Sequence, residues 1–285
     1  MIGNDAHSGH FERNDCPCAK YAISIERTGG VSSVMIRAER HERILAELAR
    51  RGSVSAQDLS KLLDASLATI RRDIADLDQR KALVRTHGGA TLPQRREELP
   101  FDAKVMAYLP EKRRIGAAAG AALEQGILVG CGGGTTVMQM VPAIRHKSLR
   151  LVTTAVNIAL ELRDARTIDV TLTGGTLRRR TAETVGHIAE RTLQDMNIDV
   201  MVMGVDGIDL EKGLTTYDSS EAYVNRVMAD RSRELWIVAD HSKFGQVFPA
   251  TILPLNRATR IFTDTGLSEE VAERYRQRGI EVLRV

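Results

Sequence analysis

The feature that most constrains this chain is the alternation of short apolar runs with helical patterns from Ile127 to the C-terminus. Short runs rich in Val, Ile and Leu are typical of buried strands. The candidate strands are residues 127–129, 149–153, 168–172, 200–203, 235–239, 260–263 and 280–283, with helix-like stretches at 157–162, 187–196, 220–232 and 268–278. This order predicts an α/β domain built on a mostly parallel sheet that helices cover on both faces.

The loop after the first of these strands reads Gly130-Cys-Gly-Gly-Gly-Thr-Thr136 and opens a helix. Glycines expose backbone N–H groups and a helix N-terminus attracts anions, so this loop is a candidate phosphate cradle. It is not a Walker loop, because no Lys follows, and it lacks the third glycine of the dinucleotide-binding fingerprint. An ordinary tight turn is the alternative interpretation.

The loops after the other strands also carry hydroxyls, glycines and carboxylates. Ligands of parallel sheets bind beyond the carboxyl ends of the strands, so we expect these loops to converge on one pocket. Lys243 offers a positive charge to a phosphate and Asp240 can accept hydrogen bonds from hydroxyls, although the two could instead form a solvated surface pair. The residues expected to bind a polyol phosphate are Gly133, Gly134, Thr135, Thr136, Thr153, Asn157, Gly174, Gly175, Asp206, Asp240 and Lys243.

Nearer the N-terminus, residues 66–77 have the pattern of an amphipathic helix. Ser66 is a good N-cap, and the apolar face behind it consists of Leu67, Ile70, Ile74 and Leu77. Ala68 and Arg72 lie nearly opposite this face, with Thr69 and Arg71 on its flanks. A small, basic outer surface suits insertion into a DNA major groove, because arginine can pair with guanine or bind phosphate. A plain surface helix with solvated arginines is the alternative.

The residues around this helix favour the DNA-binding interpretation. Residues 55–58 resemble the capped start of a short helix, which a tight link at residues 64–65 joins to the next one. Two such helices form a helix-turn-helix, with an earlier helix at 37–51 and a strand and glycine turn at 83–90 as a wing. The residues expected to contact DNA are Ser66, Ala68, Thr69, Arg71, Arg72, Arg85 and His87.

The distribution of charge agrees with this assignment. The net charge of the chain is +3, and residues 37–92 contain eleven Lys or Arg and eight Asp or Glu, so the whole excess resides there. Attraction to the phosphates of DNA requires positive charge in the DNA-binding domain.

Two motifs resemble the signature of the DeoR family of transcriptional regulators: Thr69-Ile-Arg-Arg-Asp-Ile74, and Arg85-Thr-His-Gly-Gly-Ala90. The resemblance spans about residues 37–285. It implies a repressor of carbohydrate metabolism genes that a phosphorylated sugar or related metabolite releases from its operator. It also implies a sensor domain similar in fold to ribose-phosphate isomerase and the CoA-transferase superfamily. The family usually reads Asp-Ser-Gly-Thr-Thr where this chain has Gly132-Gly-Gly-Thr-Thr136.

The alternative is a sugar-phosphate isomerase fused to a DNA-binding module. Aldose–ketose isomerisation needs a carboxylate that moves a proton between carbons. The isomerase resemblance would imply Asp-Gly-Ala-Asp-Glu, whereas this chain reads Asp206-Gly-Ile-Asp-Leu210 and lacks the final acid. The isomerase segment with a catalytic Lys and Glu corresponds to Thr173-Gly-Gly-Thr-Leu177. We therefore expect a pocket that keeps binding groups and has lost the base, hence a regulator with no enzymatic activity and no cofactor.

The remaining chain divides into parts by composition. We predict a disordered extension over residues 1–36, a winged helix-turn-helix over 37–92, a linker over 93–110 and an effector-sensing α/β domain over 111–285. Because Met35 immediately precedes the first helical pattern, we also expect the natural start to lie near it. Mass spectrometry of the native N-terminus would test this expectation.

Cysteine content and hydropathy exclude other classes. Cys16, Cys18 and Cys131 are too few for a disulfide framework, and no further ligands complete a metal site near the first two. No run approaches the ~20 apolar residues of a membrane span, and no secretory leader is visible. These patterns predict a cytoplasmic protein without metal or membrane attachment. A symmetric operator favours at least a homodimer.

Overall fold

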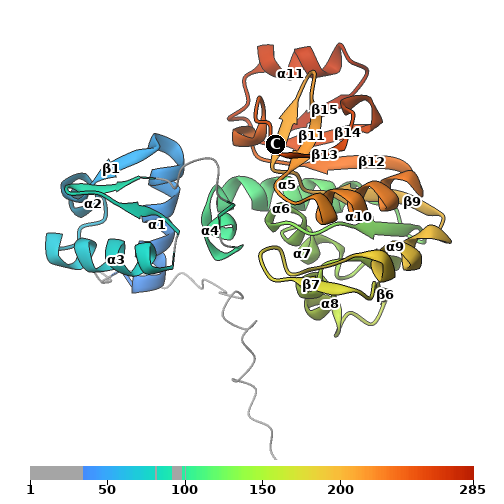
Figure 1. Ribbon diagram of the computed structural model, residues 1–285, viewed down its shortest axis with the longest axis horizontal. Helices are drawn as coiled ribbons and strands as arrows, with labels where there is room; N and C mark the ends of the chain where they lie inside the picture. The colour runs from blue at the N-terminus through green and yellow to red at the C-terminus, as the bar shows by residue number, and fades with distance from the viewer. Residues whose placement is uncertain (1–34, 81, 92–97, 100) are drawn as a thin grey trace, which may run out of the picture. The chain divides into compact units, whose positions relative to one another are not determined.

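The computed structural model describes residues 35–80, 82–91, 98–99 and 101–285 of the 285-residue chain (Figure 1). Most of the predicted N-terminal extension, with Cys16 and Cys18, lies outside the described residues, as do residues 93–97 and 100 of the predicted linker.

The N-terminal domain contains three helices and a small antiparallel sheet. The helices are α1 (Arg37–Arg51), α2 (Ala56–Leu62) and α3 (Leu67–Gln79), and the strands are β1 (Ser53–Ser55), β2 (Val84–Arg85) and β3 (Gly89–Thr91). The strands pair in the order β1-β3-β2. The apolar face predicted for α3 is buried against α1 and α2, in a core that includes Ile44, Leu48, Leu59, Ile70 and Ile74. The predicted winged helix-turn-helix is therefore confirmed.

Local signals in the sequence account for the boundaries of these elements. Ser55 caps α2 by accepting a hydrogen bond from the Asp58 N–H at 3.0 Å, and Ser66 caps α3 through the Thr69 N–H at 3.1 Å. A side chain at Gly89 would collide with the backbone of Val54, because β3 lies directly against β1 there. The glycine turn of the wing is thus required by close backbone approach.

The C-terminal domain is built on a seven-stranded sheet whose strands are all parallel, in the order β15-β14-β12-β9-β4-β5-β6 (Figure 1). Their bounds are β4 (Leu128–Cys131), β5 (Leu149–Thr153), β6 (Ile168–Leu172), β9 (Ile198–Met203), β12 (Ser232–Val238), β14 (Arg260–Thr263) and β15 (Glu281–Arg284). Each coincides with a predicted strand to within a few residues, so the predicted mostly parallel α/β sheet is confirmed.

Helices bury both faces of this sheet. They are α5 (Leu109–Ala122), α6 (Thr135–Met138), α7 (Val141–Ile144), α8 (Val156–Leu162), α9 (His187–Gln194), α10 (Ser219–Asp230) and α11 (Glu269–Arg276). The helix that precedes them, α4 (Phe101–Met106), instead contributes Ala103 to the core that contains Ile44. One core contains residues of α5, α7 and α8, and the other contains residues of α9, α10 and α11. Along β12, Ile237 faces the second core and Trp236 the first. Burial of alternate side chains on opposite faces is why residues 235–238 of β12 are all apolar.

Two small antiparallel sheets were not predicted. One pairs β10 (Gly207–Asp209), β11 (Gly213–Thr216) and β13 (Ala250–Leu253), and the other is a hairpin of β7 (Thr176–Arg178) and β8 (Glu183–Val185). Both follow main-sheet strands, and they bring side chains towards the carboxyl edge of the sheet. Two 3-10 turns, η2 (His241–Lys243) and η3 (Leu255–Arg257), complete the domain.

Within the described ranges, no helix has the length and apolar character needed to cross a membrane. The same residues contain no cluster of three or more His, Cys, Asp or Glu side chains suited to a metal ion.

Candidate DNA-binding surface and effector pocket

The outer surface of α3 presents the predicted DNA-contacting residues. Ser66, Ala68, Arg71 and Arg72 are exposed. Among the described residues, neither arginine forms an ion pair or a side-chain hydrogen bond. Thr69 is half-buried, and its hydroxyl lies 2.8 Å from the Ser66 Oγ. The two arginines are therefore available to a ligand, whereas the Thr69 hydroxyl already belongs to the helix cap.

The inner surface of α3 contains a buried charge that the sequence pattern did not reveal. The Asp73 side chain is 2% exposed and accepts a 2.8 Å hydrogen bond from the Arg40 Nε. The His41 Nε2 lies 3.1 Å from the same carboxylate, and the Arg37 Nε lies at 3.8 Å. Burial lowers the pKa of His41, although Asp73 opposes this effect. These contacts join α1 to α3 and so set the orientation of the recognition helix.

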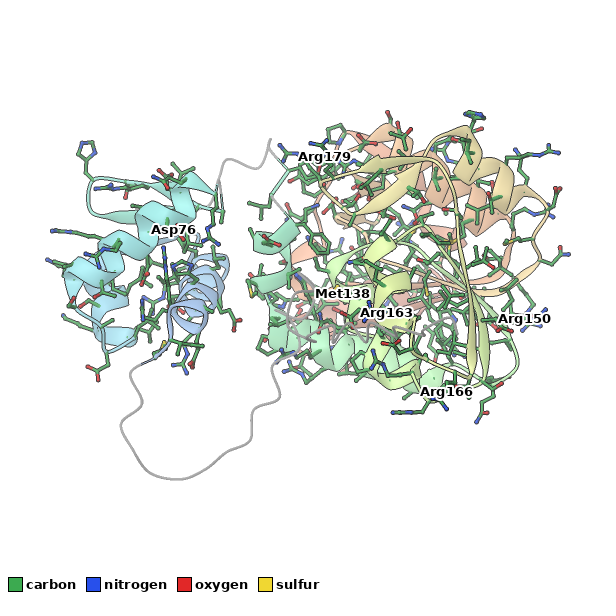
Figure 2. All side chains as sticks on the ribbon, turned by 90° about the horizontal axis from the view of Figure 1, so that it is seen from below. Asp76, Met138, Arg150, Arg163, Arg166 and Arg179 are labelled. Atoms are coloured by element: carbon green, nitrogen blue, oxygen red, sulfur yellow. The ribbon has the colours of Figure 1, made fainter. Side chains whose placement is uncertain are left out.

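The predicted wing residues are placed beside this helix. Arg85 and His87 are exposed, and the Arg85 N–H donates a 3.0 Å hydrogen bond to the Asp78 Oδ1. This bond connects β2 to the end of α3. Asp76, labelled in Figure 2, lies on the same helix, and its carboxylate pairs with Arg80 at 3.0 Å.

The C-terminal domain contains a cavity of about 520 Å³ at the carboxyl edge of its sheet. Predicted ligand-binding residues that line it are Gly133, Gly134, Thr135, Thr136, Asp206, Asp240 and Lys243. They come from loops that follow β4, β9 and β12, as the rule for parallel sheets requires. The structure thus brings most of the predicted set together.

Four predicted residues do not line this cavity. Thr153 is fully buried, and its hydroxyl donates to the Cys131 carbonyl at 2.9 Å and accepts from the Ala155 N–H. The Asn157 Oδ1 accepts from the Ile158 N–H, and its Nδ2 lies 3.2 Å from the Met138 Sδ. Gly174 and Gly175 form the turn into β7, where Gly175 has a φ of +125°. All four make local structural contacts or turns, and a ligand-binding role for them stays a prediction.

The glycine-rich loop is not an empty cradle. The Gly133 N–H donates a 2.6 Å hydrogen bond to the Oε1 of Glu183, a buried residue of the β7–β8 hairpin. The Thr154 hydroxyl donates to the same oxygen at 2.9 Å. Burial raises the pKa of Glu183. A side chain at position 133 would collide with this carboxylate, so the glycine is needed for the approach of Glu183.

A second group of charged residues surrounds Asp206. The Lys104 Nζ of α4 lies 3.2 Å from the Asp206 Oδ1, and the Lys243 Nζ lies 3.8 Å from it. The Thr216 hydroxyl donates to the Asp206 Oδ2 at 3.0 Å. Burial opposes ionisation of Asp206, but the two lysines outweigh it and lower the pKa of this carboxyl. Asp206 is therefore an anion that holds two cations at the cavity.

Asp240 has an oxygen that is free to bind a ligand. Its Oδ1 accepts hydrogen bonds from the backbone N–H and the hydroxyl of Ser242. Its Oδ2 is buried and has no hydrogen-bond partner among the described residues. A buried acceptor without a donor is costly, so this oxygen suits a hydroxyl group of a bound molecule. The adjacent His241 is held by Asp264, whose Oδ2 lies 2.8 Å from the His241 Nδ1.

Sequence reasoning missed several charged residues at this site. Lys104 and Lys112 precede the predicted sheet, and Glu183 and Glu221 belong to a hairpin and a helix that no ligand-binding motif marked. Burial also raises the pKa of Glu221 well above its usual range. The cavity thus contains carboxylates other than those of the isomerase motif. Although Leu210 replaces the acid of the isomerase motif, the pocket still contains carboxylates that can accept a proton.

Lys112 of α5 lines the cavity while only 3% exposed, and its Nζ donates a hydrogen bond to the Lys104 carbonyl. Burial lowers the pKa of Lys112 to about 7. The folded protein therefore releases this proton at lower pH than the unfolded chain, where the pKa of lysine is near 10.5. Stability from this group is lowest below about pH 7 and rises as pH increases towards the unfolded value.

We therefore expect the unfolding free energy of the wild type to increase by about 1–2 kcal/mol relative to Lys112→Met between pH 7 and pH 8.5. Chemical denaturation of both proteins across this range measures the difference. Lys212→Met, which alters an exposed lysine of the same domain, is the matched control and should show no such trend. A difference between Lys112→Met and wild type that does not vary with pH would contradict the assignment.

The geometry defines a class of protein. A winged helix-turn-helix with free arginines on its recognition helix is joined in one chain to an α/β domain with a charged pocket. This combination is that of a DNA-binding transcriptional regulator with a ligand-sensing domain.

Comparison with known proteins identifies the family. Residues 40–96 match the model of the DeoR-like helix-turn-helix domain, and residues 108–265 match that of the DeoR C-terminal sensor domain. The chain therefore belongs to the DeoR family of transcriptional regulators.

Relatives match along nearly their whole length. The HTH-type transcriptional regulator GlpR of Haloferax volcanii is 34% identical over 251 residues, which cover 87% of this chain and 98% of the relative. The glycerol-3-phosphate regulon repressor of Escherichia coli K12 is 29% identical over 231 residues, covering 81% and 92%. Among solved structures, ribose 5-phosphate isomerase A of Neisseria gonorrhoeae aligns with a TM-score of 0.35 and 17% identity, covering 47% of this chain and 52% of that one.

Proposed function

We propose that this regulator is a repressor of carbohydrate metabolism genes that leaves its operator when a phosphorylated sugar or polyol binds the sensor pocket. The observation that carries the proposal is the pairing of cations with an unsatisfied acceptor in one cavity. Lys104 and Lys243 can attract a phosphate, and the free Oδ2 of Asp240 can accept a hydroxyl hydrogen bond. The name of the E. coli relative, a glycerol-3-phosphate regulon repressor, supports the same class of effector.

The test is titration of phosphorylated sugars and polyols against the protein bound to labelled operator DNA. Release at concentrations that leave unrelated DNA-binding proteins bound supports the proposal. If no member of a broad panel of phosphorylated compounds releases the operator or raises the melting temperature, the proposal fails.

We propose further that the protein is not an enzyme. The absence of an acid at Leu210 and the regulator names of the relatives support this. Glu183 and Glu221 make a direct assay necessary, because buried carboxylates of raised pKa can act as acid–base catalysts. Incubating the full-length chain with aldose and ketose phosphates tests this, and measurable interconversion would favour the isomerase.

We propose that the protein acts in the cytoplasm as a homo-oligomer that binds a symmetric operator. Its support is the helix-turn-helix itself, because such domains bind paired half-sites as dimers. Light scattering of the protein with and without operator measures the stoichiometry.

Lys243→Ala should weaken the response to effector without changing operator affinity. The Lys243 side chain is 26% exposed, lines the cavity and lies 3.8 Å from Asp206, so it can move from that partner to a phosphate or a sugar oxygen of the effector. Loss of a charge-assisted contact worth ~1.5–3 kcal/mol should raise the half-response concentration by roughly ten- to a hundredfold. Titration of effector against the operator complex gives this value. Lys212→Ala is the control, and equal half-response concentrations for Lys243→Ala and wild type would place Lys243 outside the sensing site.

A further inference from the structure

We propose that the anionic group of the effector binds between Lys104 and Arg178, where it replaces the side chain of Glu98. This inference rests on the proposed function, because it assigns the phosphate of the effector to a site beside the sensor pocket, which Lys104 lines. Glu98 and Lys104 lie between the two ranges that the family models match, so neither residue belongs to a motif of either domain.

The first observation is that Glu98 occupies a complete anion site. Its Oε1 accepts hydrogen bonds from the Lys104 Nζ at 3.0 Å and the Arg178 Nη1 at 3.1 Å. Its Oε2 accepts from the Arg178 Nη2, so the arginine holds the carboxylate with two parallel bonds. A phosphate presents oxygens in the same arrangement, and the guanidinium fork recognises both groups.

The second observation is burial. The Glu98, Lys104 and Arg178 side chains are 7%, 14% and 13% exposed. Cations shielded from water to this extent require a nearby anion, because an uncompensated buried charge is strongly unfavourable. Asp206 pairs with Lys104, and Asp218 and Glu221 pair with Arg178, but Glu98 alone pairs with both cations, so a phosphate that replaces it must bridge the same two side chains.

The third observation is that Glu98 is the exchangeable partner of Arg178. The other two carboxylates that form ion pairs with this arginine, among the described residues, are Asp218, at 3.3 Å from its Nε, and Glu221, at 3.3 Å from its Nη1. Asp218 caps α10 and Glu221 lies within its first turn, so both are held by the helix. Glu98 lies outside any helix or strand, and its backbone is held to this domain by a bond from Arg180 to its carbonyl. Replacing its side chain breaks no strand pairing or helix cap.

The fourth observation concerns the alternative location. The Gly133 N–H, which the sequence predicted to bind phosphate, is already bonded to Glu183. The helix that the loop opens, α6, has only four residues, so its N-terminus is a weak anion site. Lys104 lines the cavity and reaches Asp206 on one side and Glu98 on the other. The cationic pair is thus the stronger site for the anion.

Replacing the Glu98 side chain with an anion would affect the segment between the two domains, because Glu98 belongs to that segment. Glu98 precedes α4, in the segment that connects the DNA-binding domain to the sensor domain in sequence. Displacement of Glu98 by an anion would free this connection from Arg178. Effector binding is then linked to the segment that leads to the DNA-binding domain.

The test measures binding of inorganic phosphate to the full-length chain by calorimetry. Glu98→Gln removes the competing charge but keeps the shape of the side chain, so we expect phosphate to bind at least about tenfold more tightly than to the wild type. Glu98→Gln combined with Arg178→Gln should lose this gain. Circular dichroism and thermal melting report whether each variant is folded.

The matched control is Glu269→Gln. Glu269 is also paired with two arginines, Arg276 and Arg284, but is 64% exposed and lies outside the cavity. It should leave phosphate affinity unchanged. Unchanged phosphate affinity in folded Glu98→Gln, or a gain that persists when Arg178 is also replaced, would overturn the inference.

The outcomes separate this inference from the proposed function. If a phosphorylated polyol releases the operator but Glu98→Gln does not bind phosphate more tightly than the wild type, the proposed function stands and the anion site at Glu98 is wrong. If Glu98→Gln binds phosphate more tightly and this increase requires Arg178, but no phosphorylated compound releases the operator, the anion site stands and the proposed class of effector is wrong.

Discussion

Replacing Arg72 with alanine is expected to weaken operator binding by ~1–3 kcal/mol, which is roughly a 5- to 150-fold loss of affinity. Arg72 is exposed on the face of α3 opposite the buried Ile70 and Ile74, and it has no ion-pair partner among the residues that the structure describes. Fluorescence anisotropy with labelled operator measures the loss. If Arg72 contacts a guanine edge, one base preference should relax; if it binds phosphate, the dependence on salt should decrease.

Arg80→Ala is the control for this measurement. Arg80 is also exposed and adjoins the C-terminal end of α3, but it pairs with Asp76 at 3.0 Å. Because it is remote from the N-terminal end of the recognition helix, its replacement should change operator affinity far less. Operator affinity equal to wild type in folded Arg72→Ala would refute the assigned role of Arg72.

Asp73→Ala is expected to destabilise the DNA-binding domain by about 3–5 kcal/mol, because it removes the anion that pairs with the largely buried Arg40 guanidinium. Arg40 is 12% exposed and His41 is 11% exposed, so neither can turn fully to water when the carboxylate is lost. A typical domain stability is about 5–15 kcal/mol, so this loss is a large share of the free energy of unfolding. Operator binding should weaken as the DNA-binding domain unfolds at lower temperature than in the wild type.

Domain-resolved unfolding checks this expectation. The only tryptophan, Trp236, is buried in the sensor domain, so its fluorescence reports that domain. We expect the tryptophan transition to be unchanged in Asp73→Ala, while circular dichroism shows earlier loss of helix. Asp58→Ala, which removes an exposed carboxylate from the same domain, should have only a small effect on both. Wild-type operator affinity and an unchanged helical transition in Asp73→Ala would show that the buried network contributes little.

The position of Arg72 could be predicted from the sequence, whereas the role of its neighbour Asp73 could not. The spacing of apolar residues was enough to place Arg72 on the outer face, because helix geometry depends on neighbours three and four positions away. It was not enough to explain Asp73. The partners of Asp73 lie on α1, more than thirty positions earlier in the chain, and only the packing of α1 on α3 brings them within hydrogen-bonding distance.

In the sensor pocket, too, the sequence predicted some features and the tertiary structure decided others. Glycine and hydroxyl clusters after the strands predicted which edge of the sheet would carry the site, and Gly133, Asp206 and Lys243 do line the cavity there. The same reasoning included Thr153, because a hydroxyl at a strand end suits either a ligand or the backbone. Burial decided between them, since the Thr153 hydroxyl is fully occupied by backbone groups.

By itself, the sequence determined the elements whose signals are local. Ser55 and Ser66 cap helices through bonds to residues three positions ahead, and apolar runs marked each strand of the main sheet. Only the tertiary structure decided the contacts that make the site, because their partners are distant in sequence. Glu183 reaches Gly133 across 50 positions, and Glu98 reaches Arg178 across 80. Such pairs depend on how the sheet and its hairpin bring the chain together, and no local periodicity encodes that arrangement.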